Sequence, residues 1–179
     1  MENLAKIHKE ELAAVEDQVV TMLESFLQVS KVLIVTNAKK GWVEYSSSIL
    51  LPKVHQMIMK YIPVKSARGD FEQQYQGQIS EWKKAAFMSL WDIEGLIDKA
   101  AITNLIVIGD SQHEMDAGKN FQKSANMCFT KQIKLRENPT AEELVKQLSV
   151  INQKFNYIIS SFKSFNLKLE KTQSSKSTK

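Results

Sequence analysis

The sequence contains one cysteine, Cys128, so no internal disulfide framework is expected and a reducing compartment is predicted. Nowhere do about 18 or more apolar residues run together, so we expect no membrane-spanning helix. The first residues carry charges of both signs and lack the apolar core and small-residue cleavage site of a secretory signal. These absences predict a cytoplasmic protein that has no membrane partner.

The composition is that of a folded globular protein, with 43% apolar and 25% charged residues in 179. This length suits one domain and is short for two. The net charge of +4 is concentrated in residues 163–179, which hold five lysines and one glutamate among serines and threonines. We expect residues 1–162 to form the domain and residues 163–179 to be a basic, disordered tail. A nucleic-acid partner is not expected, because no aromatic stacking platform or recognition motif accompanies these lysines.

Two continuous aliphatic runs, at residues 31–36 and 104–109, predict strands that are buried on both faces. Weaker signals predict strands at residues 63–67 and near residues 127–135. Strands and helices alternate along the chain, and the connections between them are mostly short. The sequence therefore predicts an α/β fold, a three-layer Rossmann-like arrangement with a parallel sheet between helices.

Apolar residues at steps of three and four predict the helices between these strands. Pro52 lies inside one helical stripe, so we expect two helical pieces or one kinked helix there. Residues 68–78 are polar and contain glycine, which predicts a loop, and Ser80 is expected to cap the helix that follows it. The expected helices cover residues 10–29, 43–61, 81–90 with a continuation to 99, a segment after Ser111 that ends near 124, and 139–162.

Two carboxylates follow the strand that ends at Gly109. Asp110 comes directly after this strand, and Glu114 lies one helical turn further on, which brings both to one side of the strand–helix junction. Hard oxygen donors of this kind suit Mg²⁺, and Gly109 allows close approach of the backbone. The alternative is that Asp110 caps the helix and Glu114 is solvated.

Further polar groups are expected at the same end of the sheet. Thr36 and Asn37 end the first strand, where a hydroxyl and exposed N–H groups can hold a phosphate oxygen. Lys83, with Lys84 as the alternative, lies at the start of a helix, and a lysine directed at the sheet end would neutralise phosphate charge. Each of these observations also has a structural interpretation, since Thr-Asn is a common end to a strand and most such lysines are solvated.

Taken in order, these segments resemble the motifs of the haloacid dehalogenase (HAD) superfamily. Thr36 in Lys-Val-Leu-Ile-Val-Thr-Asn matches the second motif, Lys83 in Glu-Trp-Lys-Lys-Ala-Ala-Phe the third, and Asp110 and Glu114 in Ile-Gly-Asp-Ser-Gln-His-Glu the fourth. The resemblance covers about residues 10–160, and it is closest to a group of eukaryotic HAD-like proteins without an assigned activity. It implies a Mg²⁺-dependent phosphohydrolase, with Asp110 and Glu114 at the metal, Thr36, Asn37 and Lys83 at the phosphate, and Lys83 as a catalytic residue.

The first HAD motif, Asp-x-Asp-x-Thr, does not occur in this chain, since no two aspartates stand two residues apart. In the family this motif supplies the nucleophile and ends the central strand of a sheet ordered 5-4-1-2-3. Without that strand, its two neighbours would leave backbone groups unpaired. Three solutions remain open, of which we favour the first: the chain is a truncated form of a longer protein, the two neighbours pair directly, or a partner supplies a strand.

The resemblance and the missing motif together predict a HAD-like domain without its central first strand that is inactive as a phosphohydrolase. Removing a catalytic nucleophile lowers the rate by about a million-fold, and Mg²⁺ is expected to bind weakly. The alternatives are a non-catalytic module that binds a phosphorylated ligand or a protein partner, or a truncated form of an active Mg²⁺-dependent phosphatase. The sequence does not predict the substrate.

Overall fold

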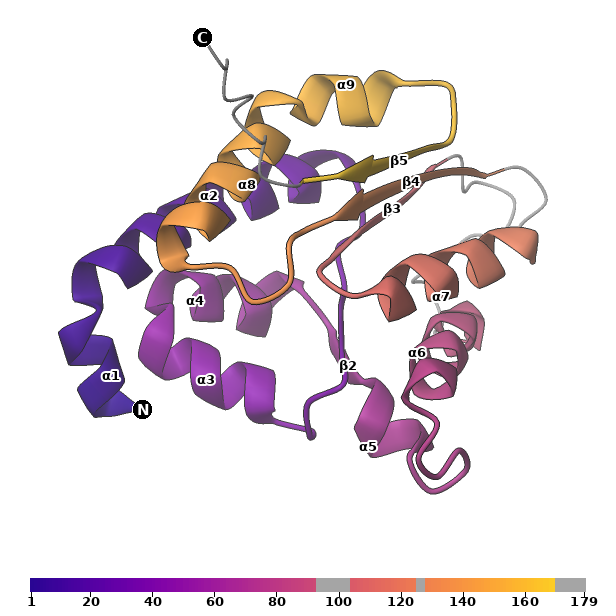
Figure 1. Cartoon of the computed structure of the whole chain (residues 1–179), viewed down its shortest axis with the longest axis horizontal. Helices are drawn as coiled ribbons and strands as arrows, with labels where there is room; N and C mark the ends of the chain where they lie inside the picture. Colours follow the sequence, from indigo (N-terminus) through magenta and orange to yellow (C-terminus); the bar gives the residue numbers. More distant parts are fainter. Residues whose placement is uncertain (93–103, 125–127, 170–179) are drawn as a thin grey trace, which may run out of the picture.

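The computed structural model describes residues 1–92, 104–124 and 128–169 of the chain. In these residues it has an α/β fold with two small parallel sheets (Figure 1). One sheet pairs β1 with β2, and the other has the order β3-β4-β5. The strands are β1 (Ile34–Thr36), β2 (Val64–Ser66), β3 (Asn104–Gly109), β4 (Phe129–Lys134) and β5 (Phe165–Lys168).

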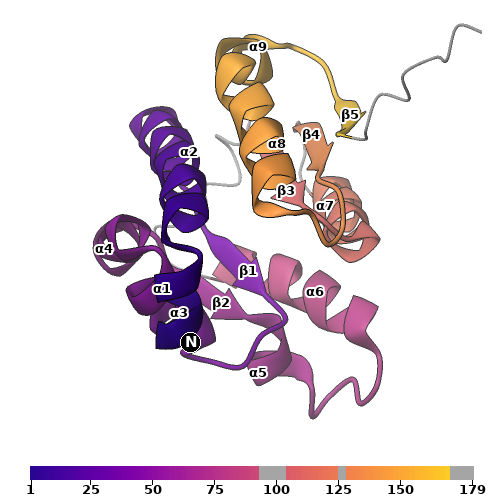
Figure 2. The ribbon, with the colours of Figure 1, turned by 60° about the vertical axis from the view of Figure 1, so that its left-hand side comes forward.

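Helices cover both faces of these sheets (Figures 1 and 2). On one face α2, α4 and α8 pack against the strands, and on the other face α5, α6 and α7 do so. A short 3-10 turn, Ser89–Asp92, follows α6. The helices are α1 (Glu2–Ile7), α2 (Lys9–Val29), α3 (Trp42–Leu50), α4 (Pro52–Tyr61), α5 (Ala67–Phe71), α6 (Ile79–Met88), α7 (Gln112–Lys123), α8 (Ala141–Gln153) and α9 (Phe155–Ser160).

Two helices connect the sheets because each of them packs against both. On α2, Leu23 is buried against the β1-β2 sheet, and Phe26 is buried with Ile133 of β4. On α6, Ala86 packs beside β1, and Phe87 lies in the cluster that contains Val107 of β3. The apolar residues of α2 and α6 therefore hold the two sheets in one body.

The strongest strand prediction is confirmed in full, since β3 spans residues 104–109 as the aliphatic run indicates. The run at residues 31–36 yields a shorter strand, β1, that begins at Ile34. Both strands are less buried than predicted: Val107 is buried, but Ile106 and Ile108 are only half-buried, as are all residues of β1. Direct pairing of β1 with β3, one of the open alternatives, is wrong, because these strands belong to separate sheets.

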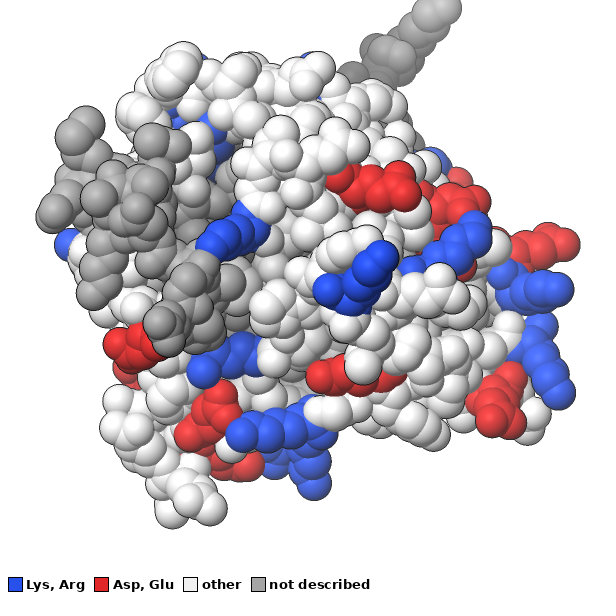
Figure 3. All heavy atoms as spheres, turned by 180° about the vertical axis from the view of Figure 1, so that it is seen from behind, with Lys and Arg blue, Asp and Glu red and all other residues white. Residues whose placement is uncertain are grey.

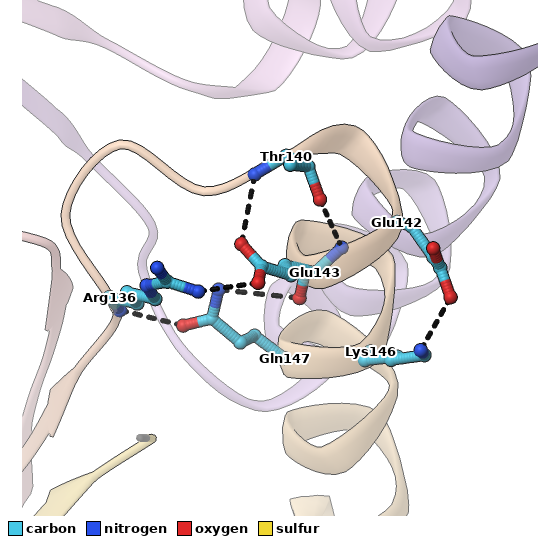
Figure 4. Close-up of polar contacts among 6 residues, drawn as sticks. All are labelled: Arg136, Thr140, Glu142, Glu143, Lys146 and Gln147. Carbon is cyan, nitrogen blue, oxygen red and sulfur yellow. Dashed lines mark hydrogen bonds and ion pairs between the residues drawn. The ribbon is translucent and has the colours of Figure 1, made fainter. Parts of the chain in front are cut away.

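The helix boundaries follow local chemistry where proline or a cap is present. Pro52 begins α4 at the first helical position, and α3 ends two residues earlier, so the predicted break is confirmed. At the start of α8, the Thr140 hydroxyl accepts a 3.2 Å hydrogen bond from the N–H of Glu143 (Figure 4). The Glu143 carboxylate accepts one from the N–H of Thr140 in return. This capping box fixes the first turn of α8.

Three predictions about the elements are wrong. Residues 67–71 form α5 instead of a loop, because the Ser66 hydroxyl accepts a 2.8 Å hydrogen bond from the Gly69 N–H and caps a helical turn. The last long helix ends at Gln153, and the chain resumes as α9, whose Phe155 packs edge-on against Phe26 at 5.1 Å between ring centroids. Residues 165–168 are not a disordered tail but form β5, which pairs in parallel with β4.

Smaller differences concern the ends of elements. The helix expected from residue 81 begins at Ile79, and Gln78 takes the cap position predicted for Ser80. The predicted continuation to residue 99 and the last part of the tail, residues 170–179, lie outside the described residues. Over the described residues, no helix has the length and apolar character that crossing a membrane requires.

Candidate functional site

The site is centred on Lys83, whose side chain is only 4% exposed to solvent. Lys83 lies in α6, and its ammonium group reaches the carboxyl end of β1, where it donates a 2.7 Å hydrogen bond to the carbonyl oxygen of Val35. The same nitrogen lies 3.1 Å from Oε1 of Glu114. Lys83 therefore connects the end of β1 with the helix that follows β3.

Glu114 is held by the strand–helix junction as well as by Lys83. Its Oε2 accepts hydrogen bonds from the backbone N–H of Ser111, at 2.9 Å, and from the Ser111 hydroxyl, at 2.6 Å. A β-carbon on Gly109 would lie 2.9 Å from the side chain of Glu114, so glycine is required for this close approach. Ser111 and Glu114 thus form the capping box of α7.

The charge on Glu114 is stabilised despite its burial. Burial by itself would raise the pKa of the carboxyl group, because a low-dielectric surrounding disfavours the ionised form. The hydrogen bonds from Ser111 and the positive charge of Lys83 outweigh this effect, and the pKa of Glu114 lies below its ordinary value. The ionised carboxylate and the ammonium group therefore form a compensated buried pair.

Thr36 and Asn37 lie at the carboxyl end of β1, beside the carbonyl that Lys83 contacts. The Thr36 hydroxyl oxygen accepts a 3.0 Å hydrogen bond from the N–H of Ala38, which shapes the loop after the strand. The side-chain oxygen of Asn37 is buried and has no hydrogen-bond partner within the described part of the chain. A buried acceptor without a donor is costly, so the hydrogen-bonding capacity of this oxygen is left unsatisfied.

The predicted residues differ in how closely they approach one another. Asp110 is exposed at the end of β3, and its carbonyl oxygen accepts a 2.8 Å hydrogen bond from Lys134. Lys84, the alternative to Lys83, points away and pairs with Glu81 on the surface of α6 at 2.6 Å. Of the two lysines, it is therefore Lys83 that reaches the ends of β1 and β3, which lie at the same edge of the fold.

A magnesium ion fits this arrangement poorly. Mg²⁺ usually binds one or two protein carboxylates, but both oxygens of Glu114 are already engaged by Ser111 and Lys83. Only the Asp110 carboxylate is left as a donor from the predicted pair. No cluster of three or more histidine, cysteine, aspartate or glutamate side chains occurs in the described ranges. The alternative in which Asp110 caps α7 is wrong, since Ser111 is the cap.

Two contributors to the site were not identified from the sequence. The Ser111 hydroxyl positions Glu114, and the motif Ser-x-x-Glu, typical of a capping box, would have indicated this role. No sequence motif indicates the contact of Lys83 with the Val35 carbonyl. A strand carbonyl is accessible to a lysine side chain only where no neighbouring strand pairs with it. Only the tertiary structure reveals it.

On the face of the molecule opposite to that seen in Figure 1, the distribution of charged side chains does not indicate a further site. In Figure 3 basic and acidic side chains are interspersed over the described surface and do not separate by sign.

Comparison with known proteins does not identify a relative: no family model, curated protein or solved structure matches the chain.

Proposed function

We propose that the chain is a HAD-like module that binds a phosphorylated ligand at the shared edge of β1 and β3 and does not hydrolyse it at an enzymatic rate. The observation that carries this proposal is the position of Lys83, a buried ammonium group next to the end of β1 and 3.1 Å from Glu114. Buried lysines at the carboxyl ends of parallel strands are suited to anionic ligands, which bind at this edge in α/β folds.

The strand pairing supports the HAD-like interpretation. In the family order 5-4-1-2-3, the second and third strands pair, the fourth and fifth strands pair, and the first strand separates the two pairs. Here β1 pairs with β2 and β3 pairs with β4, both in parallel. This is the pattern expected when the position between them is empty.

Charge sets the strength of phosphate binding. Lys83 and Glu114 compensate one another, and Asp110 adds a negative charge at the edge. A phosphate dianion therefore gains hydrogen bonds from the Lys83 ammonium group, the Thr36 hydroxyl and the N–H groups of the loop after β1, but meets no net positive charge. We expect weak binding, in the millimolar range, as is usual for an anion held by a few hydrogen bonds without net positive charge. Mg²⁺ binding, through Asp110, is expected to be weak as well.

Hydrolysis is not expected, because the chain lacks the Asp-x-Asp motif whose first aspartate is the nucleophile in the family. Without a nucleophile the covalent step is lost, and the rate falls by about a million-fold. The predicted cytoplasmic location belongs to this proposal and stays a prediction.

The test combines a binding and an activity measurement. Binding of inorganic phosphate is followed by NMR through the amide signals of residues 36–39, with Lys83→Met as the test variant and Lys84→Met as the matched control. We expect Lys83→Met to abolish the shifts and Lys84→Met to preserve them. Asp110→Asn is expected to strengthen binding severalfold, since it removes a negative charge from the edge.

The activity arm uses p-nitrophenyl phosphate with Mg²⁺. We expect no turnover above the buffer rate in the wild-type chain. Turnover that disappears in Asp110→Asn would contradict the proposed lack of activity. Amide shifts that are equal in Lys83→Met and wild type would contradict the proposed phosphate site.

A further inference from the structure

A small basic pocket lies at the carboxyl ends of β4 and β5, which run side by side in parallel (Figure 1). Its volume is about 220 Å³. This is below the usual size of a site for a drug-sized ligand, roughly 300–1,000 Å³, but it is room for several water molecules of about 30 Å³ each. The pocket therefore suits a small ion or one charged group of a ligand. Its lining residues are Lys134, Leu135, Arg136, Glu137, Lys168 and Leu169.

Two lysines stand next to each other in this pocket. Lys134 of β4 and Lys168 of β5 are register partners, so their side chains leave the same face of the sheet from strands about 4.8 Å apart. Two positive charges at this spacing repel each other and are stabilised by an anion between them. Arg136, two residues beyond β4, adds a third positive charge to the lining.

Glu137 supplies a counter-charge inside the pocket. Its Oε1 lies 3.1 Å from the ammonium nitrogen of Lys134, which also donates a 2.8 Å hydrogen bond to the carbonyl oxygen of Asp110. The Glu137 side chain is 61% exposed and that of Lys134 only 18%. An exposed ion pair contributes little to stability, so the carboxylate can move into solvent at small cost while Lys134 stays in place. An anion from solution can then take the position of the carboxylate.

The other two basic side chains can bind the same anion. The backbone of Arg136 is fixed, because its N–H donates a 2.7 Å hydrogen bond to the side-chain oxygen of Gln147 (Figure 4). Its guanidinium group contacts Glu143 through one nitrogen, Nη1, which leaves further N–H groups for a second acceptor. Lys168 is exposed and forms no ion pair within the described part of the chain. Three cationic donors thus border one small volume.

We propose that this pocket binds a doubly charged oxyanion, the phosphate group of a small ligand or inorganic phosphate, which replaces the Glu137 carboxylate as the counter-charge of Lys134. The lining holds three basic residues and one acidic residue, so a dianion matches its charge better than a single carboxylate does. Residues 170–179, which follow in the sequence, contain three lysines and one glutamate. An anion from solution therefore complements the pocket better than this basic segment. The site is separate from the one proposed at the ends of β1 and β3 and does not depend on it.

The test titrates inorganic phosphate into the full chain at constant ionic strength and follows the amide NMR signals of residues 135–137 and 168. We expect saturable shifts of these signals, and about tenfold weaker binding of acetate, which carries a single charge. Glycerol 3-phosphate distinguishes the two sources of the phosphate group. Binding as tight as that of inorganic phosphate assigns the pocket to phosphorylated ligands, and about tenfold weaker binding assigns it to the free anion; both results agree with the proposal.

Two substitutions should change the phosphate affinity in opposite directions. Lys168→Gln removes a positive charge and should weaken binding about fivefold, the effect of one unit charge near the anion in a solvated pocket. Glu137→Gln removes the competing carboxylate and should strengthen binding by a similar factor. Lys163→Gln is the matched control, because it removes the same charge from an exposed residue outside the lining, and it should leave the affinity unchanged. Urea unfolding confirms that the variants fold, and a loss of structure cannot produce the gain expected for Glu137→Gln.

Three outcomes would overturn the proposal. The first is equal phosphate affinity in Lys168→Gln, Glu137→Gln and wild type. The second is a response confined to residues 36–39, which would place phosphate at the end of β1 alone; shifts at the β4-β5 pocket without shifts at residues 36–39 would instead contradict only the function proposed above. The third is a gain in Glu170→Gln as large as that in Glu137→Gln, which would assign the counter-charge of the pocket to the segment that follows β5.

Discussion

The Lys83 ammonium nitrogen and Oε1 of Glu114 lie 3.1 Å apart, and their side chains are 4% and 15% exposed. The pair links α6 to the start of α7 at the edge where β1 and β3 end. Because both groups are shielded from water, each depends on the other for compensation of its charge.

Removing one partner of the pair should destabilise the fold strongly. We expect Lys83→Met to lower the free energy of unfolding by about 3 kcal/mol, since it leaves the Glu114 carboxylate buried without its counter-charge. Urea denaturation measures the effect. Lys84→Met, on the same helix but paired at the surface with Glu81, is the control and should change stability by less than about 0.5 kcal/mol.

The double variant Lys83→Met/Glu114→Gln tests the coupling itself. In this variant the buried charge is removed together with its partner, so its loss of stability should be smaller than the sum of the two single losses by about 1–3 kcal/mol. Additive losses would show that the two side chains do not interact in solution.

Acid should weaken the fold through Glu114. Its pKa in the folded chain lies below the ordinary value of 4.5, so the stability that its charge contributes is complete above pH 4.5. This contribution is lost as the pH falls through the lower pKa of the folded state. We expect Glu114→Gln to show a shallower decline of unfolding free energy below pH 4.5 than wild type. Parallel pH profiles of the two proteins would contradict this prediction.

The capping box of α8 should contribute measurably to stability. In Figure 4 the Thr140 hydroxyl and the Glu143 carboxylate each accept from the other residue's N–H, and Arg136 contacts Glu143 from the preceding loop. We expect Thr140→Ala to cost about 1 kcal/mol in thermal or urea unfolding. Thr140→Ser retains the hydroxyl oxygen and should remain close to wild type. Equal losses in both variants would indicate packing of the threonine methyl group instead of capping.

The β5 strand should contribute to the stability of the fold. Phe165 packs in the cluster of Ile133 and Ile158, and the Leu169 N–H donates a 2.9 Å hydrogen bond to Lys134. A chain that ends at residue 162 should be less stable than one that ends at residue 169 by roughly 2–4 kcal/mol, because it loses this burial and exposes the edge of β4. Equal urea midpoints of the two chains would show that β5 contributes nothing.

Elements with a strong local signal were predicted from the sequence. The β-branched run at residues 104–109 forms β3 with the predicted ends, and Pro52 separates α3 from α4 because it lacks the N–H that would continue a helix. The carboxyl ends of β1 and β3 were also expected at one edge, since parallel strands end on the same side. The Lys83 contacts with Val35 and Glu114 agree with that expectation.

Elements that depend on distant partners were missed. The sequence of β5, Phe-Asn-Leu-Lys, is short and lies in a basic segment, so only its pairing with β4 makes it a strand. The end of α8 at Gln153 has no proline or glycine to mark it, and the packing of Phe155 on Phe26 requires the turn. Tertiary packing overrides weak local preferences at both places.

The sequence by itself determined the α/β class, the positions of the main strands and the set of polar residues at their ends, because periodicity, proline and capping chemistry act within a few residues. Only the tertiary structure decided that Lys83 and not Lys84 is buried, that Glu114 is held by Ser111, and that the sheet is divided between β1 and β3. Adjacent lysines are chemically equivalent in a sequence, and the direction of each side chain on a packed helix distinguishes them. Strand pairing likewise depends on contacts between segments that are far apart in the chain.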